Sequence, residues 1–474
     1  MSGSRRLAAD ATLRAASAAH IPAVPRASYP LRPGNFVRPL VDGEPAFRRI
    51  GEAVLAARRS VWVTIAYIDR TAQLPDGHGT VFDLLERAAA RGLDVRVLFW
   101  REPRLREVEP DSSHFEGNAA DLAWLRERGA RLHARWDRLP DGFCQHQKSW
   151  IVDAGEPAEI AFVGGINLDA NSIAPPGHAP RGTPQIHDVY LELRGPCATD
   201  VHHNFVQRWN EASDRAEPGG VWPDARSAGA LAFPARLSRP AGPVPVQITR
   251  TVLAGRYVDA TATPGGQPFP IAGGEASVIE QYLAAIAAAR RTLYLENQAI
   301  GSPGVVDALE AALSRGVEVV FLVPGNAHPA FIEARHEPLA AFFFEKLARL
   351  GRFEHFTLAA IAASHADGRY DEIYVHSKLA LVDDAWCTIG STNIAERSFH
   401  QDTELNASLW HPECVRALRR ELLLEHLGLD TADFDDRDAL RAFREIACRN
   451  AERRVSREPL AGLAYAIDPE KYGA

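Results

Sequence analysis

The chain has 474 residues, of which 46% are hydrophobic and 24% are charged, and its formal net charge is -8. This balance is typical of a globular protein with two or three domains. The acidic average argues against a protein that holds nucleic acid by its backbone, because such proteins usually present a basic face. No run of about 18 apolar residues occurs, so we expect no membrane-spanning helix.

The N-terminal sequence and the cysteine content indicate the cellular compartment in which the protein works. Arg5 and Arg6 are not followed by a continuous apolar segment, so we expect no secretory signal. The five cysteines are odd in number and none forms a CxxC pair, which favours free, mostly buried thiols in a reducing compartment over metal ligation. We expect a cytoplasmic protein with peripheral contact to a membrane surface. An amphipathic helix over residues 5–20 is one candidate for that contact.

Strands and helices alternate along the first half of the chain. Residues 61–68 have the composition of a buried strand, residues 79–92 have helical apolar spacing with a closing glycine, and residues 93–100 are again strand-like. Three more strands and a helix follow, at 146–153, 159–165, 187–195 and 200–212. This alternation predicts an α/β sheet that is covered by helices on both faces.

The same plan returns after a Pro-, Gly- and Ala-rich segment from Glu217 to Pro245. Its helices and strands are predicted at 278–298, 305–316, 317–325, 373–384, 385–391, 403–410 and 415–428. Two copies of one plan indicate a duplication, and we expect the active site where the copies meet. We therefore divide the chain into an N-terminal extension (1–40), a first domain (41–216), a linker (217–245), a second domain (246–430) and a C-terminal tail (431–474).

One local pattern occurs at the same place in both copies. It consists of a histidine, a lysine, an aspartate, a glycine-containing turn and an asparagine. The residues are His146, Lys148, Asp153 and Asn167 in the first copy, and His376, Lys378, Asp383 and Asn393 in the second. A single match would be weak evidence, but two matches in equivalent places predict a shared catalytic site.

The spacing of this pattern suits a phosphodiester site. Side chains alternate along a strand, so a histidine and a lysine at positions i and i+2 project from the same face. Two facing modules would gather two histidines, two lysines and two asparagines, and the last two types would hold the nonbridging phosphate oxygens. One neutral imidazole would attack phosphorus while the other, protonated, donates to the leaving oxygen. Their roles reverse when water or an alcohol attacks the phosphohistidine.

These residues resemble the paired HKD motifs of the phospholipase D superfamily. The resemblance covers roughly residues 45–430 and extends to the segment Tyr294–Gln298, which is similar to a conserved stretch of that family. Ala299 follows this segment where the family commonly has an aromatic residue. The resemblance implies an α/β fold of two phospholipase D-like α-β-α sandwich repeats, packed as a pseudo-two-fold pair.

The resemblance also implies a role for each residue. His146 would be the nucleophile, and His376 would be the general acid and then the general base. Asp188 and Glu404 would each orient the histidine of the opposite copy and fix its tautomer.

The remaining motif residues divide into two groups. The implied phosphate-binding residues are Lys148, Lys378, Asn167 and Asn393. Asp153 and Asp383 complete the catalytic motif, and we expect them to hold local structure rather than to contact the substrate.

The leading functional prediction is a phospholipase D-like enzyme that hydrolyses glycerophospholipid head groups to phosphatidic acid, or transfers the phosphatidyl group to an alcohol. The alternative is a cardiolipin synthase-type transferase with a lipid alcohol as acceptor, although such enzymes commonly carry N-terminal transmembrane helices. A nuclease of the same superfamily is less favoured, because the net charge is -8 and small nucleases of this kind often carry one motif per chain. Intact histidines and lysines in both copies argue against an inactive lipid-binding relative.

The predicted partners are a phospholipid at a membrane surface and a water or alcohol acceptor. The chemistry needs no metal or other cofactor because lysines supply the positive charge, so we expect activity to survive chelators. We expect a monomer, since the two motifs complete one site within a single chain. Trp222 and Phe269 lie in irregular segments, and they either insert into the lipid interface or pack on the body of the protein.

Overall fold

Seven strands of the first half lie side by side in the order β4-β3-β2-β5-β6-β8-β1. The pairs among β4, β3 and β2 are parallel, and the other pairs are antiparallel. Their bounds are β1 (Arg32–Val41), β2 (Ser60–Ile65), β3 (Asp94–Trp100), β4 (His133–Asp137), β5 (Ser149–Val152), β6 (Ile160–Gly164) and β8 (Val189–Arg194). This computed structural model describes residues 20–101, 113, 115–140, 142–223 and 229–474.

The second half repeats this order strand for strand, as β15-β14-β12-β17-β18-β20-β10. Again the first three strands are parallel to one another and the other pairs are antiparallel. Their bounds are β10 (Val244–Val252), β12 (Thr292–Asn297), β14 (Glu318–Leu322), β15 (Phe356–Ser364), β17 (Lys378–Val382), β18 (Trp386–Gly390) and β20 (Glu404–Leu409). The duplication predicted from the sequence is therefore present in the sheet itself.

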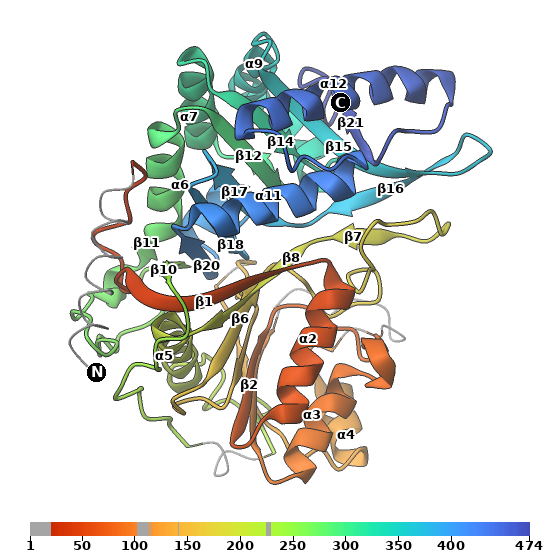
Figure 1. The fold of residues 1–474 in the computed structure, drawn as a ribbon. Helices are drawn as coiled ribbons and strands as arrows, with labels where there is room; N and C mark the ends of the chain where they lie inside the picture. Colours follow the sequence, from red (N-terminus) through yellow and green to blue (C-terminus); the bar gives the residue numbers. More distant parts are fainter. Residues whose placement is uncertain (1–19, 102–112, 114, 141, 224–228) are drawn as a thin grey trace.

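The remaining strands are short or join the halves. They are β7 (Gln185–His187), β9 (Val221–Trp222), β11 (Glu275–Ala276), β13 (Ile300–Gly301), β16 (Tyr370–Val375), β19 (Ile394–Ala395) and β21 (Ala464–Ala466). Strand β1 pairs with β10, and β7 runs parallel to β16, so strands of both halves belong to one 19-stranded sheet. In Figure 1 β1, β7 and β16 cross the middle of the molecule between the two halves.

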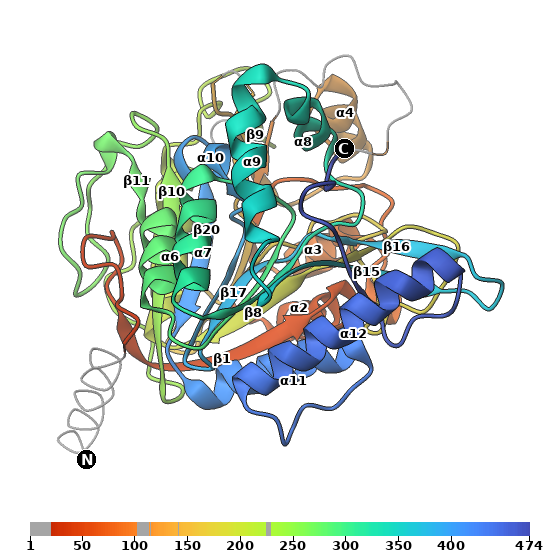
Figure 2. The same ribbon diagram turned by 90° about the horizontal axis from the view of Figure 1, so that it is seen from above.

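Helices cover both faces of each half. They are α2 (Gly43–Ala56), α3 (Val81–Ala90), α4 (Ala119–Glu127), α5 (Pro196–Asn210), α6 (Ser277–Ala288), α7 (Pro303–Ser314), α8 (Pro329–Arg335), α9 (Ala341–Leu350), α10 (Glu396–His400), α11 (Pro412–Leu427) and α12 (Asp436–Ser456), with single 3-10 turns η1 (Pro75–Gly77), η3 (Ile271–Gly273) and η4 (Pro338–Ala340). Figure 2 shows α6, α7 and α9 on one side of the second half and α11 and α12 on the other. The predicted α/β architecture, a pair of α-β-α repeats, is confirmed.

Strand alternation explains why each half has two cores. In β12, Leu293 and Leu295 pack into the core beneath α6 and α7, whereas Tyr294 between them packs into the core beneath α11 and α12. Because both faces are covered, β2 and β12 are buried along their whole length. The core beneath α11 and α12 is continuous with the one beneath α5, so the two halves share it.

Local signals set several helix ends. Helix α3 begins with a capping box, in which the Thr80 side chain accepts from the Asp83 N–H and the Asp83 carboxylate accepts from the Thr80 N–H at 2.7 Å. Helix α11 ends at Gly428, whose φ of 63° is the left-handed conformation that glycine adopts at low cost. None of the helices in the described ranges has the length and apolar character needed to cross a bilayer.

Several ordered elements lie in segments that the sequence had left outside the two domains. Strand β1 begins at Arg32, inside the predicted N-terminal extension, and pairs with β8 and β10. Strand β9 lies in the predicted linker and pairs with β4. Helix α12 and β21 lie in the predicted tail, and β21 pairs with β15. The domain division stays a prediction, and residues 5–19 of the suggested amphipathic helix lie outside the described residues.

Candidate active site

The two histidine modules meet where the halves cross. The backbone N–H of His146 donates to the carbonyl of Thr403 in the second half at 3.0 Å. The backbone N–H of His376 makes the equivalent bond, to the carbonyl of His187 in the first half, at 2.8 Å. Each carbonyl belongs to the residue just before the carboxylate that was expected to orient that histidine. The pseudo-two-fold relation therefore extends to individual hydrogen bonds.

The structure differs from the sequence prediction in how the histidines are positioned. We expected each histidine and its lysine to share a face of one strand, but β5 begins only at Ser149 and β17 begins at Lys378. His146 and His376 lie before these strands, in extended segments that hydrogen-bond across the halves instead of within a sheet. Pairing to the opposite half, rather than strand alternation, sets where each imidazole lies.

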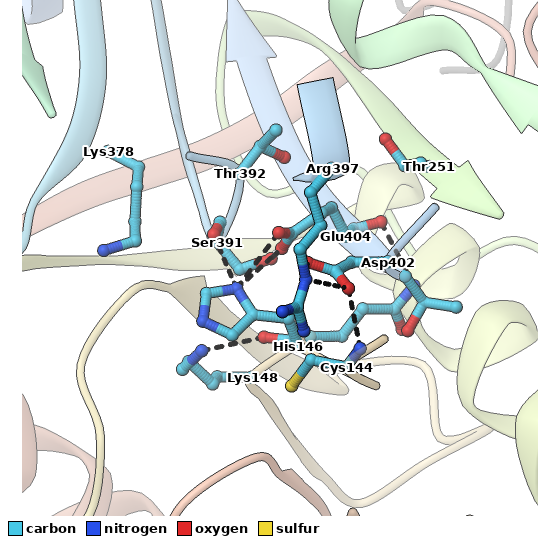
Figure 3. A network of polar contacts seen from close by, with 12 residues as sticks. Cys144, His146, Lys148, Thr251, Lys378, Ser391, Thr392, Arg397, Asp402 and Glu404 are labelled. Carbon is cyan, nitrogen blue, oxygen red and sulfur yellow. Dashed lines mark hydrogen bonds and ion pairs between the residues drawn. The ribbon is translucent and has the colours of Figure 1, made fainter. Parts of the chain in front are cut away.

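The His146 imidazole is held by the second half (Figure 3). Its Nδ1 lies 3.0 and 3.1 Å from the two carboxylate oxygens of Glu404 and 3.0 Å from the backbone carbonyl of Ser391. The Ser391 hydroxyl in turn donates to the Glu404 carboxylate at 2.5 Å. With Nδ1 occupied in this way, Nε2 is the nitrogen available to a substrate.

The His376 imidazole is held by the first half. Its Nδ1 lies 2.6 Å from the Asp188 Oδ2 atom. The Asp188 carboxylate also accepts the backbone N–H of Val189 at 2.7 Å, which fixes its orientation. Both pairings expected from the sequence, His146 with Glu404 and His376 with Asp188, are formed across the halves.

Burial and the nearby lysines favour neutral imidazoles. Burial, followed by the ammonium groups of Lys148 and Lys378, holds the pKa of His146 and the pKa of His376 well below the usual histidine range. Burial raises the pKa of Glu404 to about 8 and the pKa of Asp188 to about 7. In both pairs the shifts favour the less charged form of the imidazole and of the carboxylate.

Both lysines lie beneath the histidines and are buried. Lys148 Nζ donates to the carbonyl of His146 at 2.8 Å, and Lys378 Nζ donates to the carbonyl of His376. Lys378 also lies 3.3 Å from the side-chain oxygen of Gln298, in the segment that resembles the family's conserved stretch. Burial lowers the pKa of Lys378 to about 7, although Asp188 partly offsets this shift.

The asparagines open into the same cavity as the histidines. The cavity has a volume of about 1030 Å³, and its lining includes His146, His376, Asn167 and Asn393. The side-chain oxygens of both asparagines are buried and have no hydrogen-bond partner within the described residues. They are thus available to a ligand, once the amide orientation is allowed to adjust.

The two motif aspartates lie away from the cavity. Asp153 Oδ1 accepts the backbone N–H groups of Arg58, Arg59 and Ser60, at 2.8, 2.7 and 3.3 Å. Asp383 accepts the equivalent groups of Arg290, Arg291 and Thr292, and it also bonds to His20. These contacts fix the turn before β2 or β12 and agree with the local role expected for both residues.

The same cavity also has an apolar wall, which the sequence had not predicted. It is formed by Phe331 of α8 and by Phe343 and Phe344 of α9, with Leu339 at its edge. Leu339 is 99% exposed and its neighbour Phe342 is 63% exposed. The signal in the sequence was the run Phe342–Phe344, three adjacent phenylalanines in the first turn of α9. By contrast Trp222, suggested as a membrane contact, is buried against the body of the protein.

All five cysteines are free, as expected, and Cys144, Cys197 and Cys387 are buried. Cys144 lies in the cavity lining, where burial raises the pKa of its thiol well above the usual value. A thiol in that state is a poor nucleophile. The side chains whose spacing suits a metal ion gather outside the cavity, around His187.

The duplicated sheet and the two opposed His/Lys modules agree with the resemblance to the phospholipase D superfamily, and the comparisons with known proteins support it. Residues 282–424 match the family model described as "Cardiolipin synthase, PLD-like domain". Cardiolipin synthase A of Pseudomonas aeruginosa (strain LESB58) is 26% identical over 382 residues, which is 79% of this chain. Phospholipase D alpha 4 of Arabidopsis thaliana is 25% identical over 511 aligned positions, covering 82% of this chain and 65% of that protein.

Among solved structures, the phosphatidylserine synthase of Haemophilus influenzae Rd KW20 has the same fold. It aligns with a TM-score of 0.56 and 12% identity, and the alignment covers 96% of this chain and 100% of the synthase chain. The chain spans 64% of the length of the Pseudomonas aeruginosa relative.

Proposed function

We propose that the protein cleaves the head-group phosphodiester of a glycerophospholipid and transfers the phosphatidyl group to an alcohol or to water. The observation that carries this proposal is the cavity itself. Two imidazoles, each bonded to a carboxylate of the opposite half, and three phenylalanines line one space of about 1030 Å³. A phosphate at the histidines would leave an acyl-bearing group against the apolar wall.

In the first step Nε2 of His146 attacks phosphorus. A P–N bond forms, the P–O bond to the head group breaks, and His376 donates its proton to the departing oxygen. Lys148, Lys378 and the two asparagines stabilise the charge that builds on the nonbridging oxygens. Glu404 stabilises the His146 ring as it becomes cationic.

In the second step the acceptor hydroxyl attacks the phosphohistidine. His376, now neutral, takes the acceptor's proton while the P–N bond breaks and His146 is regenerated. Asp188 keeps the His376 ring in position through both steps and stabilises its cationic form. All of these groups come from one chain, which supports a monomer as the working unit.

Exposed apolar side chains near the cavity support the proposal that substrate is taken up from a membrane. Leu339, which lines the cavity, and Phe342, which precedes Phe343 in α9, project apolar surface into solvent. Apolar side chains exposed beside a cavity mouth commonly mark a lipid or protein contact. We propose that η4 and the start of α9 rest on the lipid surface, so that an acyl chain passes from the bilayer onto the phenylalanines.

The proposed function has two forms, which differ in whether the acceptor is a lipid alcohol or water. Names of relatives and of the matching family model favour a lipid alcohol, as in cardiolipin synthases, and the cavity volume supports this form because a second lipid needs room. Water as acceptor would give a phospholipase D instead.

A transfer assay tests the proposal. Wild-type protein is mixed with phosphatidylcholine vesicles, ethanol and EDTA, and phosphatidylethanol is sought by mass spectrometry. We expect product from the wild type and from His336→Ala, a variant of an exposed histidine, but not from His146→Ala. Vesicles of phosphatidylglycerol alone then separate the two acceptors, because transfer yields cardiolipin and hydrolysis yields phosphatidic acid.

Product from His146→Ala at the wild-type rate would contradict the proposed site. Absence of any phosphatidyl product with phosphatidylcholine, phosphatidylglycerol and phosphatidylethanolamine would contradict the lipid substrate.

A further inference from the structure

A second cluster of ionisable side chains lies outside the cavity, at the junction of the halves. Its members are Asp42, His178, His187, Glu296, Glu425 and His426, and all have buried side chains. Asp42 precedes α2, His178 lies in the loop before β7, and His187 ends β7. Glu425 and His426 come from α11 of the second half, and Glu296 comes from β12. None of the six lines the cavity.

Four atoms of this cluster converge on one point. Asp42 Oδ1 lies 3.1 Å from His178 Nε2 and 2.9 Å from His187 Nδ1. Glu425 Oε1 lies 3.4 Å from His178 Nε2 and 3.3 Å from His187 Nδ1. All four atoms lie within 4.8 Å of one another. Tetrahedral ligands at zinc distances of about 2.0–2.2 Å are separated by about 3.3–3.6 Å, which is close to this spacing.

The two carboxylates contact the imidazoles differently. Asp42 Oδ1 makes hydrogen bonds to both His178 and His187, whereas Glu425 Oε1 contacts them only as an ion pair. Glu425 Oε1 is buried between the two imidazoles yet has no hydrogen bond to any described residue. Asp42 occupies the N-cap position of α2, where an aspartate usually accepts a backbone N–H, but its side chain makes no such bond. Its carboxylate points at His178 and His187 instead. The Glu425 oxygen without a hydrogen-bond partner is the feature expected where a cation lies between these side chains.

A second layer of groups orients His187. Its other ring nitrogen, Nε2, lies 3.0 Å from Glu296 Oε2. Glu296 is held by His426 at 3.1 Å and by the hydroxyl of Tyr294, which donates at 2.6 Å. A histidine that binds a metal typically donates its other N–H to a carboxylate, which fixes the tautomer and leaves the opposite nitrogen as the ligand. Here that arrangement leaves His187 Nδ1 as the ligand.

We propose that Asp42 Oδ1, His178 Nε2, His187 Nδ1 and Glu425 Oε1 bind one zinc ion with a structural role. Four protein ligands close a tetrahedral site and leave no position for a reacting water. Mixed imidazole and carboxylate ligands suit zinc, and its double charge balances the two carboxylates while both imidazoles are neutral. The positions 42, 178, 187 and 425 are too far apart in the sequence for a spacing motif, which explains why no metal was expected.

The ion would link the halves next to the catalytic machinery. Asp42, His178 and His187 belong to the first half, whereas Glu425 belongs to α11 of the second. His187 immediately precedes Asp188, and its carbonyl accepts the backbone N–H of His376 at 2.8 Å. The zinc would therefore act as a positioning element for the His376–Asp188 pair and would not touch the substrate.

Metal content tests this inference without any activity measurement. Untagged protein is produced with zinc in the medium, freed of loosely bound metal by brief gel filtration in EDTA, and measured by elemental mass spectrometry. We expect about one zinc per chain. His178→Ala and Glu425→Gln should each lower zinc content at least tenfold. Glu296→Gln should keep the ion but weaken its affinity by roughly 10–100-fold in a chelator titration.

The matched control is His202→Ala. His202 is also buried and paired with a carboxylate, Glu159, at 3.1 Å, but it lies outside the cluster. Its loss should leave zinc content unchanged. X-ray absorption of the wild type adds a test that needs no variant, with an expected shell of nitrogen and oxygen ligands that includes two imidazoles.

Wild-type protein with no zinc, and no rise in melting temperature when zinc is added, would overturn the inference and leave a metal-free ion-pair cluster. Sulfur in the zinc shell, or full zinc content in both ligand variants, would overturn it as well. Because zinc content is read without turnover, failure of the proposed lipid chemistry would not affect this result.

Discussion

The first half presents Asp188 to the opposite histidine, and the second half presents Glu404, a carboxylate that is one methylene longer. The neighbouring turn differs in the same sense, with Gly165 in the first half and Ser391 in the second. A Cβ atom on Gly165 would lie 2.4 Å from Asp188 Oδ1. The longer arm of Glu404 leaves room for the Ser391 side chain, whose hydroxyl bonds to it at 2.5 Å.

In each half the size of the turn residue therefore matches the length of the carboxylate, and the arrangement of the site is the same in both. Glycine accompanies the short carboxylate, and serine accompanies the long one. His146 thus gains contacts from Glu404 and from the Ser391 carbonyl, whereas His376 bonds to Asp188 through one short contact of 2.6 Å. A more fully held ring suits a nucleophile, and a single carboxylate partner suits a group that gives and takes a proton.

The sharpest test of this asymmetry replaces each histidine by alanine and uses two leaving groups. On a phospholipid, His146→Ala should lower kcat by roughly 10⁴-fold or more, and His376→Ala by about 10²–10⁴-fold. On a p-nitrophenyl phosphodiester the leaving group needs no proton. His376→Ala should then still release a burst of about one nitrophenolate per chain in stopped flow, as expected for a covalent intermediate that accumulates.

The two variants are each other's controls, because both remove a buried imidazole that is bonded to a carboxylate. A burst from His146→Ala and none from His376→Ala would assign the nucleophile to the second half. Equal losses on both substrates would contradict a division of roles.

A smaller effect should follow from the turn residues. Gly165→Ala places a methyl group against Asp188 and should displace the His376 ring, lowering kcat about 10–100-fold with little change in KM. Ser391→Ala removes one hydroxyl and should lower kcat less than about tenfold, because Glu404 keeps its contacts to His146. Steady-state kinetics on a soluble short-chain lipid measure both variants.

Circular dichroism and melting curves check that Gly165→Ala is folded. A larger loss of kcat from Ser391→Ala than from Gly165→Ala would contradict the proposed match between each turn residue and its carboxylate.

The sequence was sufficient to predict the motif residues and the fold class, because both rest on local patterns that occur twice. It also predicted the cross-half pairs His146–Glu404 and His376–Asp188, through the resemblance to a known family. The helices predicted at 79–92 and 415–428 correspond to α3 and α11, whose ends carry strong capping and glycine signals.

What the sequence did not reveal depends on contacts between distant segments. The path of His146 before β5 is set by pairing with Thr403, which no local pattern encodes. The cluster around His187 gathers residues from four separate segments of the chain. Strand β1 was missed because its proline and glycine, Pro33 and Gly34, weaken a strand signal that pairing with β8 restores.

The lysines should differ in their response to pH. Burial lowers the pKa of Lys378 to about 7, so this ammonium is charged below that pH and loses its proton as pH rises through it. Inhibition by sulfate, whose own charge is constant, should therefore weaken above pH 7 by up to about tenfold per pH unit. Lys378→Arg should remove this dependence because arginine stays charged.

Lys148→Arg, in the other half, is the matched control and should keep the wild-type midpoint. If sulfate inhibition is flat between pH 6 and pH 9, the charge on Lys378 does not control anion binding.

The smallest effect on turnover is expected from the motif aspartates. Asp153 and Asp383 both have positive φ, 57° and 53°, which asparagine tolerates well. Asp153→Asn and Asp383→Asn should therefore keep the turn but weaken hydrogen bonds from three backbone N–H groups, and lower the free energy of unfolding by about 1–3 kcal/mol. Asp383→Asn should cost more, because Asp383 also holds His20.

Urea unfolding measures the loss, and kcat per folded molecule should stay within about twofold of wild type, since neither carboxylate reaches the cavity. A hundredfold fall in kcat with unchanged stability would instead mean that these aspartates act on the substrate. The difference between the two variants is itself informative, because among the described residues His20 bonds to Asp383 but not to Asp153.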